Sequence, residues 1–328
     1  MHVGLAALLI GCGTGTDVLY VGAVLTPEAS TGNEASPSFE ASAPEASTMD
    51  QASFDGGEPA PPLTWQEHWY EHSQLLELID YDNLVAIYFD HDVDRTKTAW
   101  IFSFVSRMWK YTTATYGPIG PGRLYAIFHQ GKYESCHMDN YFSSDHDNRN
   151  VIDCGFDTWD DPPDKEPFLE SHMGSLVVEF TSRGKNTSPI YKLWGDGNWA
   201  EFYQYDLYRA LGMSAEAQSL RDQWLDPAHY DNFPRRQTHW FRDWFYPLWR
   251  DHAGADVMSR FFVLLSSNFP TRDGTDYARS MNWGEYVHFT SGAAQTDLRP
   301  LATAAFGWPT EWEAQYQKAR TDFPKIVY

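Results

Sequence analysis

Apolar residues recur at two different spacings along the chain, and the spacing changes near residue 197. Before that point, short apolar runs rich in strand-forming residues predict three strands, at 84–89, 123–129 and 151–153. Helical spacing predicts helices at 65–79 and 95–115. The polar segment 130–150 is expected to be a loop, and 151–153 is expected to be an edge strand.

Beyond residue 197, nearly every segment has the apolar spacing of a helix. The predicted helices occupy 198–211, 214–225, 235–252, 255–268, 280–293 and 310–321. The folded chain therefore divides into an α+β half, residues 63–197, and a mainly helical half, residues 198–328. We expect a functional cleft where the two halves meet.

Residues 170–206 contain two helical segments joined by a loop of roughly twenty residues. The first segment begins near Glu170 and carries His172, and the second has Glu201 in its first turn. The arrangement resembles the gluzincin zinc peptidases. In these enzymes an H-E-x-x-H helix supplies two imidazoles and the water-activating glutamate, and the next helix supplies a third ligand.

The zinc-binding motif is incomplete in this chain. When it is aligned on Val177-Val178-Glu179, His172 occupies the first ligand position. Met173 stands where the water-activating glutamate is needed, and Leu176 stands where the second histidine is needed. Neither side chain can accept a proton or bind a cation. The resemblance therefore implies a degenerate zinc site in which only His172 and Glu201 are left as ligands.

The resemblance extends beyond this motif. Residues 193–206 resemble the second-helix signature of these peptidases, and residues 289–309 resemble the end of the helical subdomain in several secreted gluzincin-like families. It implies a zincin-like fold, in which a mixed sheet and a central helix precede a helical subdomain. It also implies that three acidic residues line the cleft or orient the ligands: Glu179, Asp196 and Asp206.

Structural explanations of the two remaining ligands are also open. His172 could simply donate a hydrogen bond to a backbone carbonyl, and Glu201 suits the positive end of a helix dipole. An active site would need a third zinc ligand, and the candidates are His129, His137 and His146. It would also need another general base, and the candidates are Glu170 and Glu179.

The N-terminus predicts export and lipidation. A short apolar run ends in Leu9-Ile10-Gly11-Cys12, which resembles a bacterial lipobox, and it is too short to span a bilayer. Residues 1–12 would then be a lipoprotein signal peptide, with Cys12 as the lipidated residue. Residues 13–62 are rich in Ala, Ser, Glu and Pro, which predicts a disordered tether.

Charge and cysteine content narrow the function further. The formal net charge is −21 and no basic cluster is present, so a nucleic-acid partner is not expected. An exported protein can oxidise the remaining two cysteines, and we expect a Cys136–Cys154 disulfide. Asp90, Asp92 and Asp94 have the spacing of a calcium loop, but the glycine and the glutamate of an EF-hand are missing.

Three functions are compatible with these observations. The favoured hypothesis is a lipid-anchored, metallopeptidase-like protein that has lost catalysis and binds a peptide or protein segment in its cleft. The alternatives are an active zinc metallohydrolase with an atypical ligand set and a glycan- or cell-wall-binding surface protein. The glycan hypothesis rests on the 14 tryptophans, which could instead fill a helical core. No cofactor is expected under the first hypothesis, and zinc is expected under the second.

Overall fold

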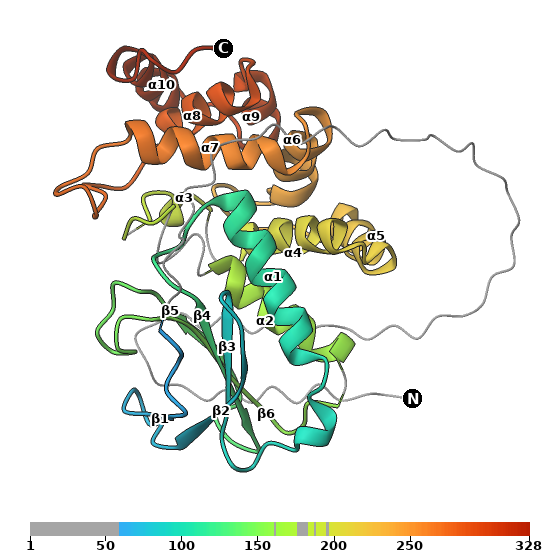
Figure 1. The fold of residues 1–328 in the computed structure, drawn as a ribbon. Helices are drawn as coiled ribbons and strands as arrows, with labels where there is room; N and C mark the ends of the chain where they lie inside the picture. Colours follow the sequence, from blue (N-terminus) through green and yellow to red (C-terminus); the bar gives the residue numbers. More distant parts are fainter. Residues whose placement is uncertain (1–58, 161, 176–182, 187, 195–196) are drawn as a thin grey trace, which may run out of the picture. The chain divides into compact units, whose positions relative to one another are not determined.

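A six-stranded mixed β-sheet forms the first half of the folded body (Figure 1). The computed structural model describes residues 59–160, 162–175, 183–186, 188–194 and 197–328, so Cys12 and most of the predicted tether lie outside the described residues. The strands are β1 (Thr64–Gln66), β2 (Leu75–Tyr81), β3 (Val85–Phe89), β4 (Leu124–Gln130), β5 (Ser135–Asp139) and β6 (Asn150–Phe156), in the spatial order β1-β2-β3-β4-β6-β5. Strands β3, β4 and β6 are parallel, and the others pair antiparallel.

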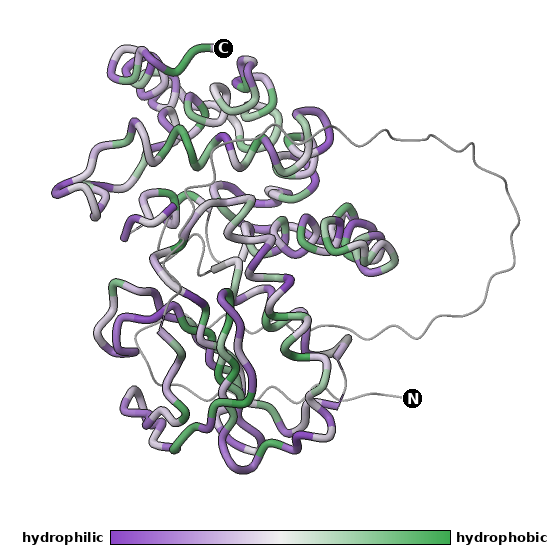
Figure 2. Tube along the Cα trace, in the orientation of Figure 1, coloured by the Kyte–Doolittle hydropathy of each residue, from purple (hydrophilic) through white to green (hydrophobic). Residues whose placement is uncertain are grey.

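The sheet is covered on both faces. Val85, Ile87 and Phe89 of β3 point toward helices α1 (Ile101–Tyr116) and α2 (Pro162–Ser175). Ala86 and Tyr88 point to the other face, where Trp65 and Trp69 from the N-terminal segment cover them. Parallel strands that are buried on both faces have continuous apolar runs. Figure 2 shows apolar residues, in green, along the central strands.

The second half of the body is helical, as the periodicity predicts, and the fold class is therefore α+β. Its helices are α3 (Tyr191–Trp194), α4 (Asn198–Leu211), α5 (Ser214–Leu225), α6 (Tyr246–Asp251), α7 (Ala255–Asn268), α8 (Trp283–Ala294), α9 (Arg299–Phe306) and α10 (Thr310–Asp322). A π-helical turn, Phe241–Phe245, precedes α6. The predicted bounds of α4, α5 and α7 are confirmed. Among the described helices, none is both long enough and apolar enough to cross a membrane.

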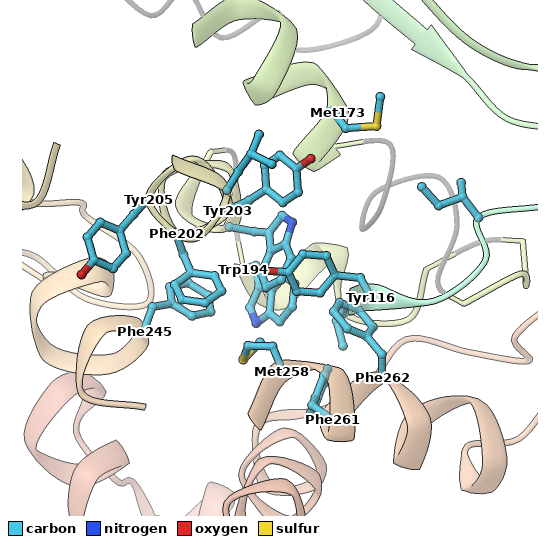
Figure 3. Packing of buried hydrophobic residues seen from close by; sticks show 14 of the residues in the cluster. Tyr116, Met173, Trp194, Phe202, Tyr203, Tyr205, Phe245, Met258, Phe261 and Phe262 are labelled. Carbon is cyan, nitrogen blue, oxygen red and sulfur yellow. The ribbon is translucent and has the colours of Figure 1, made fainter. Parts of the chain in front are cut away.

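Aromatic side chains fill the core between the helices. Trp194 stacks on Trp199 with ring centroids 4.6 Å apart. Phe245, Phe261 and Phe262 surround Trp194 at centroid distances of 5.6, 6.0 and 6.2 Å (Figure 3). Nine of the 14 tryptophans are buried and the other five are half-buried, so most of them serve packing. The glycan hypothesis stays a prediction.

Three predictions about the sheet are wrong. Residues 65–79 form β1, a connection and the start of β2 rather than a helix, because burial alternates through Trp65, Glu67 and Trp69 with the period of a strand. The expected loop 130–150 contains β5, whose polar sequence hides its strand character. Strand β6 consequently lies inside the sheet, and β5 is the edge.

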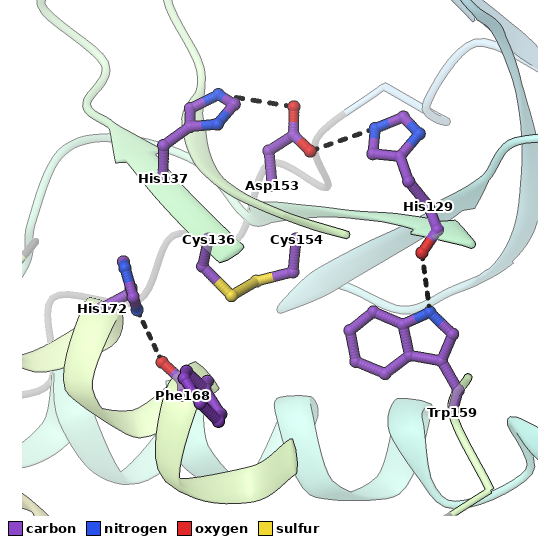
Figure 4. Close-up of a disulfide and its surroundings, with 8 residues drawn as sticks. All are labelled: His129, Cys136, His137, Asp153, Cys154, Trp159, Phe168 and His172. Atoms are coloured by element: carbon purple, nitrogen blue, oxygen red, sulfur yellow. Dashed lines mark hydrogen bonds and ion pairs between the residues drawn. A yellow bond between two sulfur atoms is a disulfide. The ribbon is translucent and has the colours of Figure 1, made fainter. Parts of the chain in front are cut away.

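The predicted disulfide is confirmed. Cys136 of β5 lies opposite Cys154 of β6, and their sulfur atoms are bonded. The bond faces α2 and joins the edge strand to the interior of the sheet (Figure 4).

The disulfide predicts a measurable loss of stability on its removal. The bond closes a loop of 18 residues, and in the chain-entropy account a loop of this length stabilises the folded state by about 3 kcal/mol. We expect the double variant Cys136→Ala/Cys154→Ala to lose about this much free energy of unfolding in urea denaturation. Unchanged stability would show that β5 is held by strand pairing alone.

Candidate metal centre

Six side chains with metal-binding atoms gather on the sheet face that points away from α1. They come from four separate segments of the chain: Glu67 and His72 between β1 and β2, His129 on β4, His137 on β5 with His146 in the loop that follows it, and Asp153 on β6. Figure 4 shows His129, His137 and Asp153 on one side of the strands and the disulfide and His172 on the other.

Strand alternation explains why these residues share one face. Ile127 and Val151 belong to the apolar cluster under Trp65 and Trp69, and His129 and Asp153 follow two residues later on the same face. His137 pairs with Asp153 across β5 and β6 in the sheet register. The apolar cluster therefore ends where the polar cluster begins.

Three buried atoms converge at the centre of this cluster. His129 Nε2 lies 2.9 Å from Glu67 Oε1 and 3.1 Å from Asp153 Oδ1, and all three side chains are fully buried. Within the described part of the chain, none of these atoms has a partner with hydrogen-bond geometry. Ligands of a tetrahedral zinc ion, each about 2.0–2.1 Å from the metal, lie roughly 3.3 Å apart. The separations are therefore close to those of a ligand set.

A hydrogen bond fixes the orientation of the central imidazole. His129 Nδ1 lies 2.8 Å from Asp90 Oδ2. Since an ionised carboxylate can only accept, Nδ1 carries the proton and donates it to Asp90. The Nε2 atom is then free to present a lone pair toward Glu67 and Asp153. A histidine that ligates a metal commonly has such a carboxylate on its other nitrogen.

A second group of nitrogen atoms adjoins the first. His137 Nε2 lies 3.3 Å from His146 Nε2 and 3.4 Å from Asp153 Oδ2. His146 Nδ1 lies 2.8 Å from Asp139 Oδ2, so a carboxylate also fixes this imidazole. Asp153 thus contacts both groups through different oxygen atoms.

His72 lies between the two groups. Its Nδ1 is 3.1 Å from Asp153 Oδ2 and 3.5 Å from Glu67 Oε1. The Tyr133 ring stacks on the imidazole at 3.6 Å. A Cβ at position 155 would lie 2.2 Å from the Tyr133 carbonyl oxygen, so only Gly155 lets this backbone approach β6.

The buried carboxylates require positive charge nearby. Burial alone would lower the pKa of His129, but its contacts with Asp153, Asp90 and Glu67 outweigh burial and raise the pKa to about 11. For His72 too, the contacts with Asp153 and Glu67 outweigh the effect of burial, and they raise its pKa to about 9. Without a bound cation the cluster must therefore hold protons on these imidazoles. Burial instead lowers the pKa of His137 to about 4, so its ring is neutral.

A surface pocket borders the second group. Its volume is about 280 Å³, and its lining consists of His68, Trp69, Tyr70, Ser144 and Asp145. Trp69 Nε1 donates to Asp153 Oδ2 at 3.0 Å, and its ring centroid lies 4.4 Å from that of His146. The Tyr70 ring lies 4.9 Å from that of His137. A small solute in this pocket would lie against Trp69 and Tyr70, whose rings contact the histidines.

The residues predicted as zinc ligands have other partners. His172 Nδ1 donates to the Phe168 carbonyl oxygen at 2.8 Å, and Glu201 Oε1 lies 2.8 Å from His229 Nε2. Among the residues that the structure describes, neither His172 nor Glu201 belongs to a group of three metal-binding side chains. Met173 is buried in the apolar core. Leu176, Glu179 and Asp196 lie outside the described residues.

The other acidic candidates have structural roles. Asp206 is buried and accepts hydrogen bonds from Tyr111, Tyr116 and Trp249, which ties α4 to α1 and α6. The aspartates with calcium-loop spacing also have separate partners: Asp90 binds His129, Asp92 pairs with Lys132, and Asp94 caps the 3-10 turn η1 (Arg95–Lys97).

Three of the six residues in this cluster are among the candidates from the sequence. His129, His137 and His146 were expected only as accessories to the helix motif. Glu67 and His72 were missed because their segment was predicted to be a helix, and Asp153 was missed because its strand was placed at the sheet edge. The alternation of Trp65, Glu67 and Trp69 is the signal that could have revealed the strand.

Known protein families give no match to this chain, and neither do curated protein sequences. The relationship to gluzincins therefore stays a prediction. The cluster itself has a defined chemistry, because it combines imidazole with carboxylate ligands and contains no thiolate. Such mixed ligands suit zinc and other divalent first-row metals.

Glu170, the proposed alternative base, is buried on α2. Both of its carboxylate oxygens lack a hydrogen-bond partner within the described residues, and burial raises its pKa well above the usual 4.5. A raised carboxyl pKa means that the folded state keeps a proton that the unfolded state loses above about pH 4.5. Stability is then lost as the pH rises from the unfolded toward the folded pKa.

We expect Glu170→Gln to raise the free energy of unfolding at neutral pH by roughly 1–3 kcal/mol, because it removes this penalty. The gain should shrink toward pH 4, where both states hold the proton. Thermal or urea unfolding across this range measures the effect. Glu134→Gln, an exposed change in the connection between β4 and β5, is the matched control and should have almost no effect. A loss of stability in Glu170→Gln would show that the carboxylate is needed.

Proposed function

We propose that the folded body is a metallohydrolase whose divalent ion, in the first instance zinc, is held on the sheet face by Glu67, His129 and Asp153. The convergence of Glu67 Oε1, His129 Nε2 and Asp153 Oδ1, buried and without hydrogen-bond partners in the described chain, carries this proposal. The ligand set is atypical for a gluzincin, and it does not use His172 or Glu201.

An ion-pair network without metal explains the geometry less well. A protonated imidazole between two buried carboxylates would direct its N–H at one of the oxygens, because a buried polar group without a hydrogen bond is costly. Neither oxygen near His129 Nε2 lies in that direction, although both are within 3.1 Å. A cation between the three atoms satisfies all of them together.

The surroundings favour a catalytic over a structural ion. Structural zinc sites are usually closed and rich in cysteine, whereas catalytic sites use histidine and carboxylate ligands and keep a position for water or substrate. Here the cluster contains no cysteine, and its second group, His137 and His146, lies behind the Trp69 and Tyr70 walls of a pocket of about 280 Å³. A bound divalent ion would supply Lewis acidity and lower the pKa of a water molecule.

Export and lipid anchoring at Cys12 remain part of the proposal. The Cys136–Cys154 disulfide supports an oxidising compartment, since such bonds are rare in the cytosol. The gluzincin relationship also remains part of it, supported by a mixed sheet whose antiparallel edge strand β5 contacts α2 and by the packing of α4 on α2. A peptide or protein ligand along β5 is the second candidate function, because β5 is one of the two outer strands of the sheet in the described chain.

Metal content tests the location of the site. In the full-length chain, purified and then dialysed against a weak chelator, we expect His129→Ala to lower the zinc content by about one ion per chain, because an anchoring ligand is lost. His172→Ala should leave the zinc content unchanged. Inductively coupled plasma mass spectrometry gives both values. If His172→Ala lowers the zinc content and His129→Ala does not, the metal site lies on α2 and α4 and this proposal fails.

Hydrolysis tests the activity. We expect metal-dependent cleavage of at least one substrate class in a panel of activated carboxylic esters, phosphate esters and peptides. The activity should disappear with a strong chelator, return with added zinc, and be absent in His129→Ala. A zinc-loaded wild-type protein that cleaves none of these classes would favour the binding function.

A further inference from the structure

We propose that the centre holds two divalent ions and that Asp153 bridges them. This inference rests on the proposed metal function and extends it. The carboxylate of Asp153 is fully buried, and its two oxygens face different partners. Oδ1 lies 3.1 Å from His129 Nε2, whereas Oδ2 lies 3.1 Å from His72 Nδ1 and 3.4 Å from His137 Nε2.

The second ion would lie between His137, His146 and Asp153 Oδ2. Since His146 Nδ1 donates to Asp139, its Nε2 presents a lone pair toward His137. The 3.3 Å between the two Nε2 atoms and the 3.4 Å to Asp153 are close to the ligand spacing around zinc, roughly 3.3 Å. His146 and Asp153 are both fully buried, so two of the three ligands are shielded from water.

The charges around the cluster are compatible with a second ion. Four carboxylates, those of Glu67, Asp90, Asp139 and Asp153, surround the cluster. In the described chain the basic side chain that pairs with them is Lys132, at 3.4 Å from Asp90. One divalent ion and Lys132 leave these four carboxylates with a net charge of −1, and a second divalent ion changes it to +1. Buried charges that lack partners are costly.

The two sites differ in access, which assigns them different roles. The first is enclosed by Glu67, His129 and Asp153, whose side chains are fully buried. Both sites have three protein ligands, but in the second the side chain of His137 is 24% exposed beside Tyr70 of the pocket. Three protein ligands leave a coordination position for a water molecule or a substrate. The second ion is therefore the one that a substrate in the pocket would meet.

Titration of the metal-free, full-length chain with Co(II) tests the number of ions, because each bound ion contributes a visible absorption band. We expect the wild type to bind two equivalents of Co(II), and Glu67→Gln and His146→Ala to bind one equivalent each. The double variant should bind none tightly. His68→Ala is the matched control: this histidine lines the same pocket and contacts Asp147 instead of the cluster, so it should keep two equivalents.

Electron paramagnetic resonance supplies the evidence for the bridge. Ions that share a carboxylate about 3.5–4 Å apart should couple magnetically in the wild type, and the coupling should be lost in either single variant. If a variant misfolds by circular dichroism, His137→Ala replaces His146→Ala, because its side chain is partly exposed.

The two proposals fail in different ways. If the wild type binds one equivalent of Co(II) and His146→Ala still binds it, the proposal of a second ion is wrong and the single-ion function stands. No binding in the wild type overturns both proposals. Two uncoupled equivalents overturn the Asp153 bridge.

Discussion

A buried carboxylate in the interior of the sheet sets the central constraint of this structure. Asp153 lies on β6, between β4 and β5, with no exposed side-chain surface, and a charge in such a place needs positive partners. Imidazoles from the β1–β2 connection and from β4 meet this need. The neutral ring of His137 on β5 lies beside the same carboxylate. The connection that carries Glu67, Trp69 and His72 is held on the sheet through contacts with the same carboxylate and its partners.

The two faces of the sheet are specialised. On the helix side, the disulfide, the apolar residues of β3 and the aromatic core around Trp194 provide stability. On the other side, the apolar cluster under Trp65 and Trp69 gives way to the histidines and carboxylates. His172 of α2 lies on the helix side and binds the Phe168 carbonyl oxygen, apart from this cluster (Figure 4).

Periodicity predicted the elements whose burial follows one simple pattern. Helices α4, α5 and α7 were placed correctly because their apolar residues recur with helical spacing between clear end signals. The segment around Trp65 and Trp69 was misassigned, since a spacing of four residues fits both a helix face and alternate positions of a strand. Strand β5 has almost no apolar pattern, because its exposure is intermediate along nearly all its length. The complete cluster could not be predicted because its residues come from four segments distant in sequence. Its assembly also depends on β6 being an inner strand, which the sequence pattern does not show.

Anomalous diffraction at the zinc absorption edge, from crystals of the full-length protein grown with zinc, tests the central claim most directly. The account predicts strong anomalous density among Glu67, His129 and Asp153, on the sheet face opposite α1. Density beside His172 and Glu201, with none on the sheet face, would contradict it.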